Sequence, residues 1–176
     1  KAIKFLHIPA ITGSEIHNTS KVASASHVVN TKMDRYSYIG NNCTVIHTQI
    51  GSFCSIADNV TIGGSAHPIQ WLSTPPLFHN EKNILKQNFA HHAFQTTQTT
   101  IIENDVWVGN NSLIKSGVTI KNGAIIGMGS VLTKDVGAYE IWAGNPARKV
   151  GERIDTDNKS LQTWLGHKRF RLPGGD

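Results

Sequence analysis

Aliphatic residues recur at every sixth position over much of this sequence, and this spacing constrains the fold more than any other feature. From Ile102 onward the chain divides into the rows IENDVW, VGNNSL, IKSGVT, IKNGAI, IGMGSV and LTKDVG. Each row opens with an aliphatic residue, and its fifth residue is small or valine. An α-helix repeats about every 3.6 residues and a strand about every 2, so neither element alone explains this period.

A chain that turns a corner once in every row does explain the spacing. Three short strands then make one triangular coil, and successive coils stack at ~4.8 Å, the spacing of neighbouring strands. Large side chains fill the interior, and small ones lie where the wall bends inward. Each coil buries its apolar edge only against the next coil, as in solenoids generally.

The same pattern continues upstream with less regularity. Further rows open at Ile16, Val22, Val28, Met33, Ile39, Val45, Ile50, Ile56 and Ile62. The rows that open at Val28 and Val45 are one residue shorter, which we interpret as a trimmed corner. Together the rows predict an all-β solenoid of about five coils.

The pattern stops at His67 and returns with the row TTQTT at Thr96–Thr100. We expect residues 68–95 to leave the solenoid, because a long insertion in a compact domain is usually functional or disordered. This excursion holds Trp71, Phe78, Phe89 and Phe94 and is too apolar for simple disorder. We therefore expect it to pack against another surface, such as a neighbouring subunit.

The pattern fades again after Val136. We assign residues 1–137 to the solenoid and residues 138–176 to a C-terminal extension. Within the extension, Tyr139–Val150 is predicted to form an extended cap. Residues 156–169 are predicted to form a short helix.

The formal net charge of +5 is unevenly placed: residues 148–171 carry seven basic and three acidic side chains, a net +4. Few aromatic side chains accompany them, so an anionic small molecule is a better partner than nucleic acid. No apolar run approaches the ~18 residues of a membrane span, and the N-terminal residues lack the pattern of a secretory signal. The two cysteines, without a CxxC motif, fit free thiols. We expect a cytoplasmic protein.

Three motifs now carry a resemblance: AHPIQWLSTPPLF, IIENDVWVG, and GMGSVLTKDV followed by AGNPAR. In this order they resemble hexapeptide-repeat acyltransferases of the xenobiotic acetyltransferase class, which includes chloramphenicol and streptogramin acetyltransferases. Sugar O-acetyltransferases are near relatives, and the match covers roughly residues 34–154. The resemblance implies a left-handed parallel β-helix, acetyl-CoA as co-substrate without a metal, and a homotrimer with its cleft between adjacent subunits.

His67 stands where the coil opens, the position at which this family has a histidine. A hydroxyl acceptor must lose its proton as it attacks a thioester, and a neutral imidazole can accept that proton near neutral pH. Neither cysteine is placed as a nucleophile, so we expect direct transfer. The growing negative charge needs preorganised N–H groups, and the resemblance assigns one to the backbone of Asn110.

The coenzyme site is carried over from the family in the same way. Glycines let a ligand approach the backbone closely, and the basic extension suits the anionic coenzyme. An alternative for Trp107 is an outward aromatic that covers a coil face, and for Lys134 a solvated turn lysine. The implied coenzyme-binding residues are Trp107, Gly109, Gly127, Met128, Thr133, Lys134, Pro146 and Arg148.

The acceptor is less well defined than the donor. We favour a carbohydrate hydroxyl, because the tail has a single tryptophan, Trp164, and His67 is followed by Pro68 where many antibiotic enzymes have arginine. Chloramphenicol or a streptogramin is the alternative acceptor, and O- versus N-transfer stays open, as does the use of an acyl group other than acetyl.

Two other classes share this fold. A γ-class carbonic anhydrase would need paired histidines on zinc, but His79, His91 and His92 do not have that spacing. An ice-binding or scaffold solenoid would need a threonine ladder, yet Thr97 and Thr99 are followed one coil later by Lys115 and Gly117.

Overall fold

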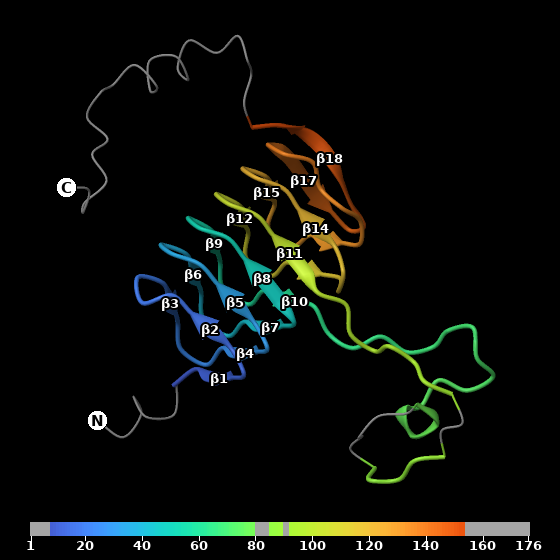
Figure 1. The fold of residues 1–176 in the computed structure, drawn as a ribbon. Coiled ribbons are helices and arrows are strands. Elements are labelled where there is room, and N and C mark those ends of the chain that lie inside the picture. Colours follow the sequence, from blue (N-terminus) through green and yellow to red (C-terminus); the bar gives the residue numbers. More distant parts are fainter. Residues whose placement is uncertain (1–7, 80–84, 90–91, 154–176) are drawn as a thin grey trace, which may run out of the picture.

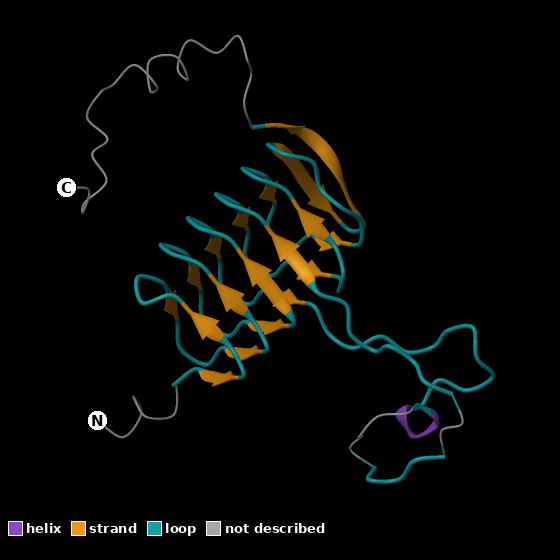
Figure 2. Cartoon of the chain, in the orientation of Figure 1, coloured by secondary structure: helices purple, strands orange, loops and turns teal. Residues whose placement is uncertain are grey.

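The computed structural model describes residues 8–79, 85–89 and 92–153. Its strands form three β-sheets around a triangular core, and all pair in parallel except the last hairpin (Figures 1 and 2). Sheet A contains β1 (Ala10–Thr12), β4 (His27–Val29), β7 (Thr44–Ile46), β10 (Thr61–Ile62), β13 (Leu113–Ile114) and β16 (Val131–Leu132). Sheet B contains β2 (Glu15–Ile16), β5 (Lys32–Met33), β8 (Thr48–Ile50), β11 (Thr100–Ile102) and β14 (Thr119–Ile120). Sheet C contains β3 (Lys21–Val22), β6 (Tyr38–Ile39), β9 (Ser55–Ile56), β12 (Trp107–Val108), β15 (Ile125–Ile126), β17 (Glu140–Gly144) and β18 (Ala147–Glu152).

From β1 to β16, successive strands visit sheets A, B and C in turn, one strand of each sheet per coil. The last coil then passes from β16 to β17 of sheet C, with only the bridge of Val136 to Ile120 on the sheet B side. The predicted solenoid is confirmed, although the six strands of sheet A give six coils rather than about five. The missed strand is β1, whose Ile11 pairs with Val28 of β4. Ile11 precedes Ile16 by five residues, the same short step as Val28 to Met33.

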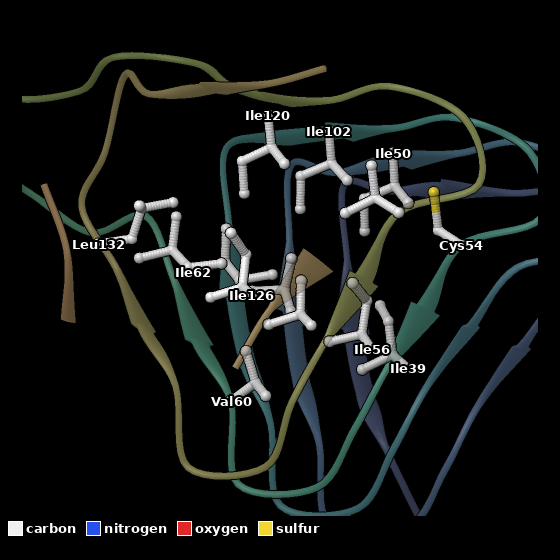
Figure 3. Close-up of a cluster of buried hydrophobic side chains, with 14 of the residues drawn as sticks. Ile39, Ile50, Cys54, Ile56, Val60, Ile62, Ile102, Ile120, Ile126 and Leu132 are labelled. Carbon is white, nitrogen blue, oxygen red and sulfur yellow. The ribbon is translucent and has the colours of Figure 1, made fainter. Parts of the chain in front are cut away.

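The interior is filled as the row pattern predicts (Figure 3). The row-opening residues Ile39, Ile56, Ile62, Ile102, Ile120, Ile126 and Leu132 are almost completely buried. The small fifth residues, among them Cys43, Cys54, Ser112 and Ser130, are buried as well. Both cysteines are free, and burial raises the pKa of each thiol, which fits a packing role rather than a reactive one.

The shortened rows all lie at one edge of the triangle, where sheet A passes to sheet B. Val28 to Met33 crosses this A–B edge in one coil, and Val45 to Ile50 crosses it in the next. The following crossing begins after Ile62 and is the one from which the excursion leaves. The interruption therefore falls at the corner whose length already varies.

An antiparallel hairpin closes the last coil: β17 pairs with β15 on one side and with β18 on the other. It confirms the extended cap predicted over Tyr139–Val150. The carboxylate of Glu140 accepts hydrogen bonds from the indole of Trp142 and the N–H of Gly137, each at 2.8 Å. Lys149 Nζ lies 3.0 Å from the same carboxylate.

No helix among the described residues is long and apolar enough to cross a membrane. The helix predicted over residues 156–169 and the remainder of the basic tail lie outside the described residues.

Candidate active site

A backbone hydrogen bond joins the two arms of the excursion where it leaves the coils at the A–B edge. The N–H of Gly63 donates to Ile114 O at 3.0 Å, and the N–H of Thr100 donates to His47 O at 3.0 Å, so both belong to the coils. Between them, the N–H of Ala66 donates to Thr96 O at 2.6 Å and joins the two arms. The coils are thus left after Gly63 and rejoined at Thr100, on either side of the excursion predicted over residues 68–95.

His67 follows Ala66 directly, and its side chain is exposed. Its Nδ1 lies 2.9 Å from the backbone oxygen of Thr74. A carbonyl oxygen can only accept a hydrogen bond, so Nδ1 carries the hydrogen and Nε2 of the neutral ring keeps its lone pair. A histidine in this tautomer is prepared to accept a proton at Nε2.

The Thr74 carbonyl is held by a stiff segment. Pro75 and Pro76 follow it, and a proline restricts both its own backbone and that of the preceding residue. The short 3₁₀ helix η2 (Pro76–Phe78) continues the segment to His79, whose N–H donates to Pro76 O at 2.9 Å.

The excursion packs largely on itself through ring contacts made by Trp71, His79 and Phe94. It also projects away from the solenoid (the green segment in Figure 1). Its outer side chains Ile69, Leu72, Leu85 and Phe89 are exposed. An apolar surface of this kind, carried on a projecting arm, is typical of a contact with another protein surface.

A second group of predicted residues lies at the C–A edge, where sheet C passes to sheet A. Gly109 and Asn110 follow β12, and Gly127 and Met128 take the same place after β15 in the next coil. A Cβ on Gly109 would lie 2.6 Å from the backbone nitrogen of Met128, so the two turns touch.

The backbone N–H groups of this edge either donate to a neighbouring coil or have no acceptor among the described residues. The N–H of Gly109 donates to Ile126 O at 2.8 Å, and the N–H of Gly129 donates to Asn110 O at 2.8 Å. Within the part of the chain that the structure describes, the N–H groups of Asn110 and Met128 donate to no acceptor. Two unused donors in adjacent coils are suited to a ligand rich in carbonyl oxygens.

The remaining predicted residues surround this edge or lie beyond it. Trp107 is half-exposed and aligned with Ile125 in sheet C. Thr133 and Lys134 are exposed and follow β16, at the A–B edge of the last coil. Pro146 lies in the turn between β17 and β18, and Arg148 is exposed in β18. Neither Lys134 nor Arg148 forms an ion pair with another described residue.

A single chain does not bring all these residues together. His67 belongs to the A–B edge, whereas Gly109, Asn110, Gly127 and Met128 belong to the C–A edge. The aromatic and polar contacts of His67 are with the excursion itself, at Thr74 and His79. Sequence reasoning did not foresee the His79 contact, because the excursion has no period from which to infer its packing.

Residues 99–134 match the family model described as bacterial transferase hexapeptide (six repeats). The chain is 37% identical over 129 residues to a chloramphenicol acetyltransferase of Agrobacterium fabrum, covering 70% of this chain and 61% of the relative. It is 34% identical over 131 residues to the galactoside O-acetyltransferase of Escherichia coli, covering 73% and 57%. The chain is a homologue of hexapeptide-repeat acetyltransferases.

A solved galactoside acetyltransferase in complex with coenzyme A matches this homologue with a TM-score of 0.53 and 26% identity, over 88% of this chain and 70% of that chain. The structural match agrees with the solenoid that the six-residue repeat of this chain predicts. The homologue spans 61% and 57% of the length of the two curated relatives. Among its described residues there is no group of three or more His, Cys, Asp or Glu side chains that could hold a metal ion.

Proposed function

We propose that this protein transfers an acetyl group from acetyl-CoA directly to a hydroxyl of a carbohydrate, with His67 as the general base. The observation that carries the proposal is the hydrogen bond from His67 Nδ1 to Thr74 O, which leaves Nε2 as a proton acceptor on an exposed ring. The homology to chloramphenicol and galactoside acetyltransferases supports the same reaction class.

The transfer proceeds in one covalent exchange. His67 Nε2 takes the proton of the acceptor hydroxyl while the hydroxyl oxygen attacks the thioester carbonyl carbon. The negative charge that develops on the carbonyl oxygen is stabilised by the N–H of Asn110, which has no acceptor among the described residues. The carbon–sulfur bond then breaks, and the departing thiolate receives the proton held by His67.

In this proposal the acetyl and pantetheine parts of the coenzyme lie along the C–A edge, and its nucleotide end reaches the last coil and the hairpin. The N–H of Met128 meets the amide-rich pantetheine arm, Gly109 and Gly127 allow its close approach, and Trp107 covers the acetyl end. Thr133 and Lys134 bind the nucleotide end, and Pro146 and Arg148 close it. The two cations have no carboxylate partner among the described residues, which suits the phosphates of coenzyme A.

The assembly is a homotrimer in this proposal. His67 and the free amides lie on different edges of one triangular prism, so a second copy that presents its C–A edge to the excursion completes the site. Repetition of that heterologous contact closes a ring. The exposed apolar side chains of the excursion, Ile69 and Leu72 among them, supply the contact surface.

A chloramphenicol-like acceptor is the second candidate. The 37% identity to a chloramphenicol acetyltransferase favours it. The single tryptophan of the basic tail and the His67–Pro68 pair favour a carbohydrate.

A thiol-release assay tests the proposal. Acetyl-CoA is incubated with the protein and a panel of galactosides, nucleotide sugars, chloramphenicol and a streptogramin. We expect a carbohydrate to accelerate thiol release at least about tenfold over hydrolysis, and His67→Ala to reduce turnover by ~10²-fold or more without loss of acetyl-CoA binding. His92→Ala, another histidine of the excursion, serves as the matched control and retains turnover.

Each outcome decides one part of the proposal. Acceleration by chloramphenicol alone overturns the carbohydrate acceptor in favour of the second candidate. Full turnover in the His67→Ala variant overturns the role of His67. Absence of thiol release with every acceptor, in protein that binds acetyl-CoA, overturns the reaction as written.

A further inference from the structure

The excursion has an interior of its own, in which a histidine is almost completely buried. His79 is 1% exposed, at the C-terminal end of η2. It forms a parallel bridge with His92 from the returning arm, so the two arms of the excursion meet beside it. Neither ring nitrogen of His79 has a hydrogen-bond partner in the described part of the chain.

The ring of His79 is enclosed by other rings. Its centroid lies 5.1 Å from that of Phe94, 5.8 Å from that of Trp71 and 5.8 Å from that of His67. Phe94 and Trp71 also contact each other, with centroids 5.6 Å apart. His79 thus packs against two large aromatic rings and against the imidazole of His67.

His67 is therefore restrained at two points by one short segment of chain. Its Nδ1 donates to Thr74 O, and its ring packs at a 56° tilt against the ring of His79. Thr74 and His79 are joined through the proline-stiffened stretch that contains η2. The imidazole of His67 thus contacts the Thr74 carbonyl and the packed ring of His79 at the same time.

Because neither ring nitrogen of His79 is hydrogen-bonded to a described residue, its contact with His67 is one of van der Waals packing. A ring that makes no hydrogen bond acts on its neighbours through its shape. His67 itself is exposed, so without a packed surface beside it the ring rotates among staggered positions. Rotation breaks the hydrogen bond to Thr74 and frees the imidazole to exchange between its two neutral tautomers.

We infer that His79 is a positioning residue for His67. Its ring holds the His67 imidazole against the Thr74 carbonyl, and so keeps the hydrogen on Nδ1 and the lone pair on Nε2. The inference rests on the proposed function only in that His67 is the base. The structural part, a packed ring that sets a tautomer, stands independently of any acceptor.

Nitrogen-15 NMR of histidine-labelled protein without ligand tests the structural part. The parent and His92→Ala are expected to show His67 in the single Nδ1–H form, because His92 contacts Trp71 at 6.4 Å and has no ring contact with His67. His79→Ala is expected to show both tautomers in exchange. His79→Phe, which restores a packed ring without nitrogen atoms, is expected to return His67 to the Nδ1–H form.

Kinetics supply the second measurement. We expect His79→Ala to lower kcat at least about tenfold with KM for acetyl-CoA unchanged within about twofold, and His79→Phe to recover most of kcat. The thermal unfolding midpoint of each variant shows that the solenoid is intact. The His92→Ala variant shows whether a packing defect elsewhere in the excursion is enough to alter the tautomer of His67.

Two results overturn the inference. One is an unchanged Nδ1–H tautomer and unchanged kcat in His79→Ala. The other is a folded His79→Phe variant that keeps the tautomer but not the turnover, because that outcome assigns His79 a polar role toward the acceptor. If His67→Ala retains turnover, the proposed function fails, and the NMR result still decides whether His79 positions the ring.

Discussion

The backbone nitrogen of Met128 lies directly beside the Cα of Gly109, so that a Cβ at position 109 would be 2.6 Å from it and 2.9 Å from the Met128 Cα. These residues are 19 positions apart in the sequence, at the C–A edge of two adjacent coils. This contact holds the Met128 amide beside the turn that contains Gly109 and Asn110. It therefore sets the separation between the two free amides, those of Asn110 and Met128. The spacing of the coils thereby becomes part of the candidate site.

Gly109→Ala should consequently displace the Met128 turn. Overpacking of backbone against a new methyl group costs roughly 1–3 kcal/mol, and we expect KM for acetyl-CoA to rise about tenfold. Gly151→Ala is the control, because a Cβ there meets nothing within 4 Å. Titration with acetyl-CoA and thermal unfolding measure the two effects. Equal behaviour of the two variants would contradict the contact.

The role proposed for Asn110 belongs to its backbone N–H and not to its side chain, and two substitutions distinguish them. Asn110→Ala keeps the N–H and should leave kcat within about threefold of the parent, whereas Asn110→Pro removes the donor and should lower kcat by ~10²–10³-fold. Steady-state kinetics compare the two variants, with the unfolding midpoint as a check on folding. A large loss in Asn110→Ala would move the role to the carboxamide.

Glu140 makes the hairpin cap sensitive to acid. The indole of Trp142, Lys149 and the Gly137 N–H hold the pKa of this carboxyl below its usual value. A group whose pKa is lowered on folding stabilises the protein above its ordinary pKa, and that contribution disappears as pH falls through the folded-state pKa.

We therefore expect Glu140→Gln to lower the unfolding midpoint by roughly 2–4 °C at neutral pH and by progressively less below about pH 4. Glu152→Gln is the control, since that carboxylate is 62% exposed and contacts Lys149 at 2.7 Å. Differential scanning calorimetry across pH gives the comparison. A deficit that is constant with pH would show that charge is not the cause.

Leu72 tests the proposed assembly, because its side chain is fully exposed on the projecting excursion. A carboxylate placed in an apolar contact is not compensated there, so Leu72→Asp should shift the molecular mass in solution from trimer toward monomer. Light scattering after size exclusion measures the mass, and turnover should fall with it. Val150→Asp, also an exposed apolar position, should leave the mass unchanged. A monomeric parent protein would refute the assembly outright.

The sequence predicts the solenoid well because each row reports the same physical requirement, one large and one small inward residue. That is why Ile62, Ile102 and Ile120 are buried as expected and the free cysteines fall at the small positions. The first strand was missed because Ile11, at the end of the stack, stands next to rows whose pattern is loose.

The candidate site is predictable only in part. The end of the period marks His67, whereas the residues of the C–A edge were assigned from the family resemblance. The Thr74 hydrogen bond and the burial of His79 do not follow from the sequence, because inside the excursion no repeat relates one residue to the next. In the proposed trimer the two edges meet through a second copy, which the period of a single sequence does not predict.

The variable corner also has a meaning for how such proteins diversify. Every departure from the six-residue step lies at the A–B edge, and the Ala66–Thr96 hydrogen bond isolates what lies beyond it from the coils. Segments of other lengths and compositions can be inserted there while the interior and the C–A edge keep their register. If the proposed function holds, selectivity toward the acceptor can change at this corner while the stacked coils stay the same.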